Sequence, residues 1–117
     1  MSIPVAIDEI RRVADGQAGF AYLLTTGADD RPHAVAVIPD FTAAGLVCTV
    51  GRTTGANASA RPAVSLVWPP GTPGDYSLIV DGTATVVGST LTVTPTGAVR
   101  HRATADGGDR KSTRLNS

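Results

Sequence analysis

The chain has 117 residues, enough for one domain with a single core and too few for two. Hydrophobic residues make up 42% of it and charged residues 17%, which favours a folded globule and excludes disorder over most of the length. The ten basic and ten acidic residues balance, and the longest apolar run is too short for a membrane span. We therefore expect no nucleic-acid partner, no membrane and a cytoplasmic location. The single cysteine, Cys48, excludes an internal disulfide and cannot hold a metal ion alone.

The first element expected is a helix that ends before Gly16. Pro4 suits its first turn, and glycine suits its C-terminal stop. The spacing of four, three and four residues predicts one apolar stripe, formed by Ile3, Ile7, Ile10 and Ala14.

After this helix the apolar period changes to two, with Gly, Pro and Asp clusters about every ten residues, a pattern typical of antiparallel strands. We expect strands at Phe20–Thr26, Pro32–Ile38, Leu46–Val50, Ala63–Trp68, Tyr76–Val87 and Leu91–Val99. Six strands of this length close most economically as a barrel, so the predicted fold class is all-β, a barrel with peripheral helices.

One connection, from Gly51 to Arg61, has a composition of its own, GRTTGANASAR. Its alanines favour a short helix, and Pro62 disfavours helix at Arg61. We therefore predict a loop that opens into a short helix.

The last nine residues differ from the rest. Asp109–Ser117 hold three of the ten basic residues and one of the ten acidic residues, which leaves seven basic and nine acidic residues elsewhere. Codons that closely resemble a common sequencing-library adaptor translate to this nonapeptide. We expect a domain at residues 1–108, from a truncated gene, followed by a non-native tail at 109–117; a natural polar tail is the alternative.

A resemblance to a known family rests on three runs of sequence: FAYLLTTGADDRPHAVAVIPDF, GLVCTVGRTTGANASARPAVSLVW and YSLIVDGTATV. In order and spacing they resemble the pyridoxamine 5′-phosphate oxidase-like proteins, over roughly Ala6 to His101. The resemblance implies the flavin-binding split β-barrel, here six-stranded, antiparallel and Greek-key. It also implies a homodimer with the cofactors at the subunit interface, FMN in most members and the deazaflavin F420 in others.

The residues themselves support a phosphate site at Arg52, Thr53 and Thr54. A guanidinium, hydroxyls and free backbone N–H groups beside a helix N-terminus suit a cofactor phosphate. The alternative is a solvated Arg52 with threonines that cap the helix. Family members commonly carry a second basic residue where this chain has Thr54. Asn57 matches the family's asparagine at the end of the loop, and a hydrogen bond within the loop is its simpler role.

By the resemblance, the strand from Arg31 to Ile38 lies beside the flavin ring, with backbone contacts from Ala34, Val35 and Ala36. The alternation places Ala34 and Ala36 on one shallow face and His33 with Val35 on the other. His33 is either a donor at the ring edge or a surface histidine.

Two further candidates lie on the strand Ala63–Trp68. Trp68 either packs in the core or an interface, or stacks near the cofactor, and Ser65 either pairs with a strand carbonyl or reaches the phosphate. Elsewhere, Cys48 is predicted to be a small buried residue, and Gly82 to mark a bulge in a long strand.

The function that follows is an FMN-dependent oxidoreductase acting on an unidentified small molecule, with an F420-dependent reductase as the alternative. No catalytic acid, base or nucleophile can be assigned. A flavin carrier without turnover, and an interaction barrel that has lost the cofactor, are further alternatives. Vitamin B6 oxidation is not expected, because the chain ends before the segment that holds the substrate phosphate in the oxidases of this family.

Overall fold

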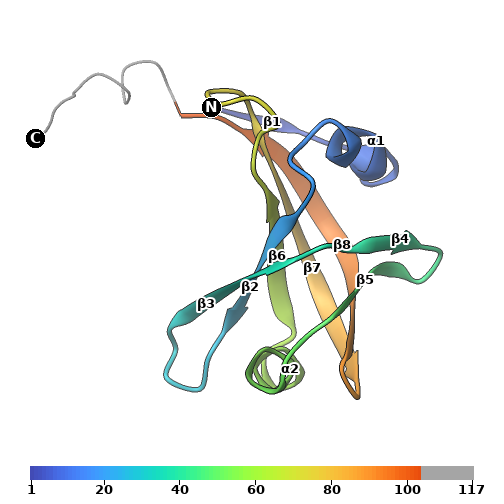
Figure 1. The fold of residues 1–117 in the computed structure, drawn as a ribbon, viewed down its shortest axis with the longest axis vertical. Helices are drawn as coiled ribbons and strands as arrows, with labels where there is room; N and C mark the ends of the chain where they lie inside the picture. Colours follow the sequence, from blue (N-terminus) through green and yellow to red (C-terminus); the bar gives the residue numbers. More distant parts are fainter. Residues whose placement is uncertain (104–117) are drawn as a thin grey trace, which may run out of the picture.

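The computed structural model describes residues 1–103, and its main feature is one curled antiparallel sheet (Figure 1). The strands are β1 Ser2–Pro4, β2 Ala21–Thr26, β3 Pro32–Val37, β4 Asp40–Thr42, β5 Gly45–Thr49, β6 Ala63–Trp68, β7 Ser77–Val87 and β8 Thr90–His101. Their order in the sheet is β3-β2-β6-β7-β8-β5-β4, and β1 pairs with the end of β8. The predicted all-β class and split-barrel architecture are confirmed. The proposed tail at 109–117 and its boundary at 108 lie outside the described residues.

All six predicted strands are present, with bounds within two residues of those expected; Ala63–Trp68 agrees at both ends. The predicted number of strands was too low, because the structure has two additional strands, β1 and β4, of three residues each. Such short strands carry almost no periodic signal of their own. They form because longer partners, β8 and β5, offer free hydrogen-bonding edges.

Barrel closure was predicted, but the two ends of the sheet, β3 and β4, are not hydrogen-bonded to each other. Only Ile38 and Pro39 separate these two strands, so they follow one another across the sheet rather than lie side by side (Figure 1). Proline also lacks the N–H that a ladder requires. The sheet is therefore split at this place.

Two helices and a short 3₁₀ turn complete the described fold. The 3₁₀ turn Ile7–Glu9 leads into α1, Ile10–Asp15, and α2 spans Arg52–Ala60. Helix α1 lies towards one end of the curled sheet, and α2 lies at the other, against β2 and β7 (Figure 1). No helix within residues 1–103 is long and apolar enough to cross a membrane.

The predicted start of the first helix was wrong. Ser2–Pro4 pairs with β8, and the helical turns begin only at Ile7. Of the predicted apolar stripe, Ile10 and Ala14 are buried, whereas Ile3 is 41% exposed. Backbone pairing with a strand almost one hundred residues away therefore overrides the local helical spacing.

The start of the second helix also differs from the prediction. Gly51 is the N-cap, and Arg52, Thr53 and Thr54 form the first turn instead of preceding it. The helix ends before Arg61 and Pro62, as predicted.

The core fills the inner face of the sheet. Strands β2, β6 and β7 alternate buried and accessible residues with the period of two seen in the sequence. The largest fully buried side chains are Leu23, Leu66, Leu78, Leu91, Val80 and Val93. Ile10 from α1 and Ala58 from α2 join this cluster, so both helices pack against the same core.

Candidate functional site

A cavity of about 540 Å³ opens where the sheet is split. One wall is formed by Ala36 and Val37 at the end of β3 together with Ile38, the next residue, and the facing wall by Val47–Thr49 of β5. Phe20, Asp40 and Thr90 complete its lining. The walls are mainly apolar, and the volume lies in the range of about 300–1,000 Å³ that is typical of small-molecule sites.

The N-terminus of α2 follows this cavity directly along the chain. Thr49 lines the cavity, and Gly51, two residues later, caps the helix. No side chain forms a cap hydrogen bond there, and Gly55 N–H, bonded to Gly51 C=O, is the first to be satisfied within the helix. Arg52 and Thr53 are exposed in this first turn. The end of the helix is thus able to bind an anion through N–H groups, a hydroxyl and a guanidinium.

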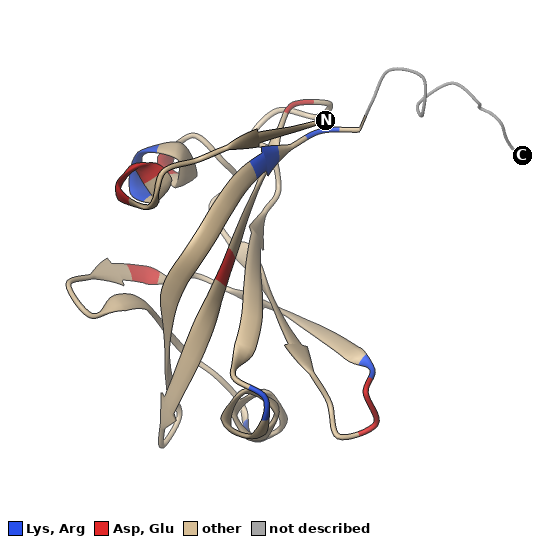
Figure 2. Ribbon diagram, turned by 180° about the vertical axis from the view of Figure 1, so that it is seen from behind, with Lys and Arg blue, Asp and Glu red and all other residues tan. Residues whose placement is uncertain are grey.

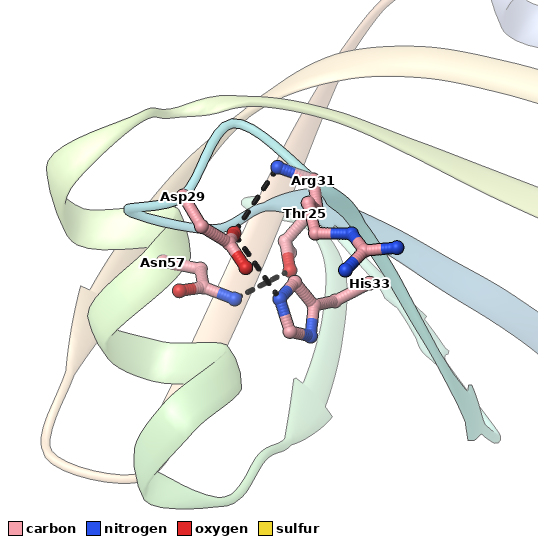
Figure 3. A network of polar contacts seen from close by, with 5 residues as sticks. All are labelled: Thr25, Asp29, Arg31, His33 and Asn57. Carbon is pink, nitrogen blue, oxygen red and sulfur yellow. Dashed lines mark hydrogen bonds and ion pairs between the residues drawn. The ribbon is translucent and has the colours of Figure 1, made fainter.

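The other two residues of the predicted phosphate cradle point inwards. Thr54 and Asn57 are each only 8% exposed. The side-chain amide of Asn57 donates a hydrogen bond of 3.3 Å to the hydroxyl of Thr25 on β2, which fixes α2 to the sheet (Figure 3). The expected role of Asn57 within its own loop is therefore replaced by a contact between the helix and the sheet.

His33 lies beside this contact, because it pairs with Thr25 in the β2–β3 ladder. Its side chain is 43% exposed, and its Nε2 lies 3.9 Å from a carboxylate oxygen of Asp29 (Figure 3). The same oxygen accepts a hydrogen bond from the backbone N–H of Arg31, which holds the turn between the two strands. His33 is thus a surface histidine beside the contact between Thr25 and Asn57.

The predicted alternation along β3 is present in its register. Ala34 and Ala36 lie opposite Leu24 and Tyr22 on the outer face, while Val35 lies opposite Leu23 of the core. Strand β3 pairs only with β2 among the described strands, so its second edge offers unpaired backbone groups. Among the residues of β3 that were predicted to contact the cofactor, Ala36 lines the cavity.

Ser65 and Trp68 are not among the residues that line the cavity. Ser65 lies on the outer face, where its hydroxyl donates a hydrogen bond of 2.6 Å to Asp81. Trp68 is 4% exposed and stacks on Phe41, with ring centroids 6.1 Å apart. Trp68 is therefore a core residue, and Ser65 pairs with a carboxylate instead of a carbonyl group.

Sequence reasoning missed most of the cavity lining, including Phe20, Ile38 and Thr49. The one signal in the sequence was Ile38, an apolar residue directly before a proline. In the structure Ile38 is 75% exposed. Cys48 was correctly predicted to be buried, and burial raises the pKa of its thiol. Cys48 is also among the residues that line the cavity. Within residues 1–103, no three His, Cys, Asp or Glu side chains gather as metal ligands.

No protein-family profile matches the chain. Two uncharacterized proteins, from Mycobacterium bovis and Mycobacterium tuberculosis, are each 43% identical to it over 75 residues, which covers 56% of this chain and 53% of each relative. The chain thus spans about half the length of the curated relatives that it matches.

Solved structures share the architecture. A candidate pyridoxamine 5′-phosphate oxidase from Listeria innocua aligns with a TM-score of 0.65 at 15% identity, over 80% of this chain and 95% of its own. An FAD-binding protein from Mycobacterium smegmatis aligns at 0.62 and 17% identity, over 87% and 100%. An F420 reductase aligns at 0.58 and 18% identity, over 71% and 90%. The chain therefore has the split β-barrel fold that pyridoxamine 5′-phosphate oxidase-like proteins share.

Proposed function

We propose that the chain binds FMN and acts as a flavin-dependent oxidoreductase on a small organic substrate. The observation that carries this proposal is the continuity of β5 and α2, since Thr49 lines an apolar cavity and Gly51 begins a helix with free N–H groups. FMN has the matching form, a flat apolar ring system joined to a phosphate. The fold is also that of proteins described as an F420 reductase and as an FAD-binding protein.

At the phosphate end, the chain supplies the backbone N–H groups of the first turn of α2, the hydroxyl of Thr53 and the guanidinium of Arg52. Thr54 contributes only its backbone, because its side chain is buried. Arg52 is then the one side-chain cation of the cradle. Each charge-assisted hydrogen bond contributes about 1.5 to 3 kcal/mol, so a few of them are sufficient for micromolar affinity.

At the ring end, the free edge of β3 offers alternating N–H and C=O groups from Ala34 to Ala36. These groups match the donors and acceptors at the polar edge of a flavin, and Ala36 and Ile38, which line the cavity, would hold its apolar part. A bound flavin would supply hydride or electron transfer, and the chain's own residues hold and orient it. A homodimer is part of this proposal, since a second copy would cover the exposed side of β3.

The test of the cofactor site compares Arg52, in the first turn of α2, with Arg61, which caps the C-terminus of that helix. Arg52→Ala should weaken FMN binding about 10- to 100-fold in a fluorescence-quenching titration, through the loss of a charge-assisted bond. Arg61→Ala removes the same charge from the other end of the helix and should leave the affinity unchanged. Equal affinities for all three proteins, with unchanged circular dichroism, would exclude Arg52 from the site.

A second candidate, F420, fits the same features, because it too joins a flat ring system to a phosphate, and the similarity to an F420 reductase favours it. Titration with both cofactors decides between them. Steady-state assays with NAD(P)H or reduced F420 then distinguish an enzyme from a carrier, which would bind the cofactor without turnover. A protein that binds neither cofactor would be a plain interaction barrel.

A further inference from the structure

A second pocket, of about 260 Å³, lies between β1, α1 and the end of β8. Its apolar walls include Ile3 and Val13, and its charged lining consists of Glu9, Arg12 and Arg100. Figure 2 shows basic bands at the end of β8, close to the N-terminus, and charges of both signs on the neighbouring helical turns. The pocket shares no lining residue with the cavity at the split of the sheet, so it is a separate place in the fold.

Two of the three charged groups in this lining neutralise each other. Oε1 of Glu9 accepts a hydrogen bond of 2.8 Å from Nε of Arg12 and lies 2.6 Å from Nη2 of the same residue. Arg100 has no such partner, since no carboxylate in the described part of the chain lies in ion-pair contact with it. The pocket therefore carries one uncompensated positive charge.

The guanidinium of Arg100 is also partly removed from water. Its Nε is shielded from solvent and has no hydrogen-bond acceptor, and it is the only buried side-chain nitrogen or oxygen of residues 1–103 in this condition. The register explains the burial, because Arg100 pairs with Ile3 on one side and with the fully buried Leu78 on the other. Buried polar groups are nearly always hydrogen-bonded, and an exception indicates a bound water or ion.

The ring of Tyr76 holds this guanidinium in place without neutralising it. The guanidinium carbon of Arg100 lies 5.0 Å from the ring centroid, and that of Arg102 lies 4.5 Å from the same centroid. The backbone C=O of Tyr76 is itself fixed by a hydrogen bond of 2.8 Å from the side-chain amide of Gln17. A ring without net charge thus attracts two cations, and their mutual repulsion favours an anion beside them.

We propose that this pocket binds a small aliphatic acid, with its carboxylate paired to Arg100 and its alkyl chain against Ile3 and Val13. The planar fork of a guanidinium matches the two oxygens of a carboxylate. One uncompensated charge suits a monoanion better than the dianion of a phosphate ester, and the apolar walls favour an alkyl chain. This inference does not depend on flavin binding, because the proposed phosphate site is at α2, towards the other end of the sheet (Figure 1).

The experiment is a titration of the full-length chain with sodium butyrate, followed by amide NMR at constant ionic strength. Saturable shifts are expected at Ile3, Val13 and Arg100, and butyramide, the neutral analogue, should not produce them. Acetate, which lacks two of the CH₂ groups, should bind about tenfold more weakly, because its shorter chain buries less apolar surface. These two comparisons need no variant, so they test the pocket in the wild-type protein.

Arg100→Gln should weaken butyrate binding at least about tenfold with unchanged circular dichroism, the loss expected for a charge-assisted contact. Arg102→Gln is the matched control, because it removes a cation from the same ring but does not line the pocket. It should leave the affinity nearly unchanged, since salt screens exposed charges. Equal shifts with butyramide, equal affinities for acetate and butyrate, equal affinity for Arg100→Gln and the wild type, or an equal loss in both variants would overturn the proposal.

Discussion

Replacement of Gly82 by alanine tests whether the β-bulge between β7 and β8, where the pairing shifts between Asp81 and Gly82, is as tightly packed as the structure indicates. A Cβ at Gly82 would lie 2.5 Å from Cγ1 of Val93 and 2.6 Å from the carbonyl oxygen of Thr94. Val93 is fully buried, and Thr94 is held in the β7–β8 ladder, so neither neighbour can move freely. The φ angle of Gly82 is not positive, so the cost is steric.

Overpacking of this kind costs about 1–3 kcal/mol, against which alanine gains about 0.4–1 kcal/mol by restricting the unfolded chain. We therefore expect Gly82→Ala to lower the free energy of unfolding by about 1–2 kcal/mol. For a domain of this size the corresponding fall in Tm is about 5–15 °C. Urea denaturation and thermal melting, both followed by circular dichroism, measure these quantities.

Gly97→Ala is the matched control, on the neighbouring strand. A Cβ at Gly97 meets nothing within 4 Å, so this variant should be unchanged or more stable by up to about 1 kcal/mol. The same stability for both variants would refute the reasoning, since it would mean that the bulge relaxes without cost.

Two more predictions concern buried polar groups. Asn57→Ala should lower the free energy of unfolding by about 1–3 kcal/mol, because it leaves the hydroxyl of Thr25 buried without its partner. A double-mutant cycle with Thr25→Val, measured by urea denaturation, should show coupling, and strict additivity would contradict the contact. Burial raises the pKa of Cys48, so the thiol loses its proton at a lower pH in the unfolded chain than in the folded one. The stability that this protonated thiol contributes is complete below about pH 9.0, the ordinary pKa of the group, and is lost as the pH rises through the pKa of the folded state. Cys48→Ala should flatten that decline in unfolding experiments between pH 7 and 10, and an unchanged slope would exclude the thiol as its cause.

Much of the fold could be predicted because its signals are local. The alternation in Ala63–Trp68 places every second residue against the core, and the structure has a strand with the same bounds. Gly82 was predicted to mark a bulge, and the pairing of β7 with β8 shifts at that residue. The first helix shows the limit, since Ile3 fits a helical stripe but lies in β1, paired with Arg100. No local pattern records a partner so distant in the chain.

For the candidate site, the sequence indicated the segment but not the direction of its side chains. Arg52, Thr53, Thr54 and Asn57 were grouped by composition and by resemblance. The structure divides them, with two exposed at the start of α2 and two turned towards the sheet. Which side of a short helix faces inwards depends on the surface that it covers, here β2 and β7.

The sequence by itself determined the class of the fold, most of its strands and the glycine-bounded segment beside a cation, because each depends on residues close together in the chain. The tertiary structure alone decided where the sheet splits, which side chains line the cavity and that Ile3 of β1 and Arg100 of β8 line one pocket. These features bring together residues from strands that are distant in sequence. Their positions follow from strand pairing and register, which depend on the energy of the whole sheet.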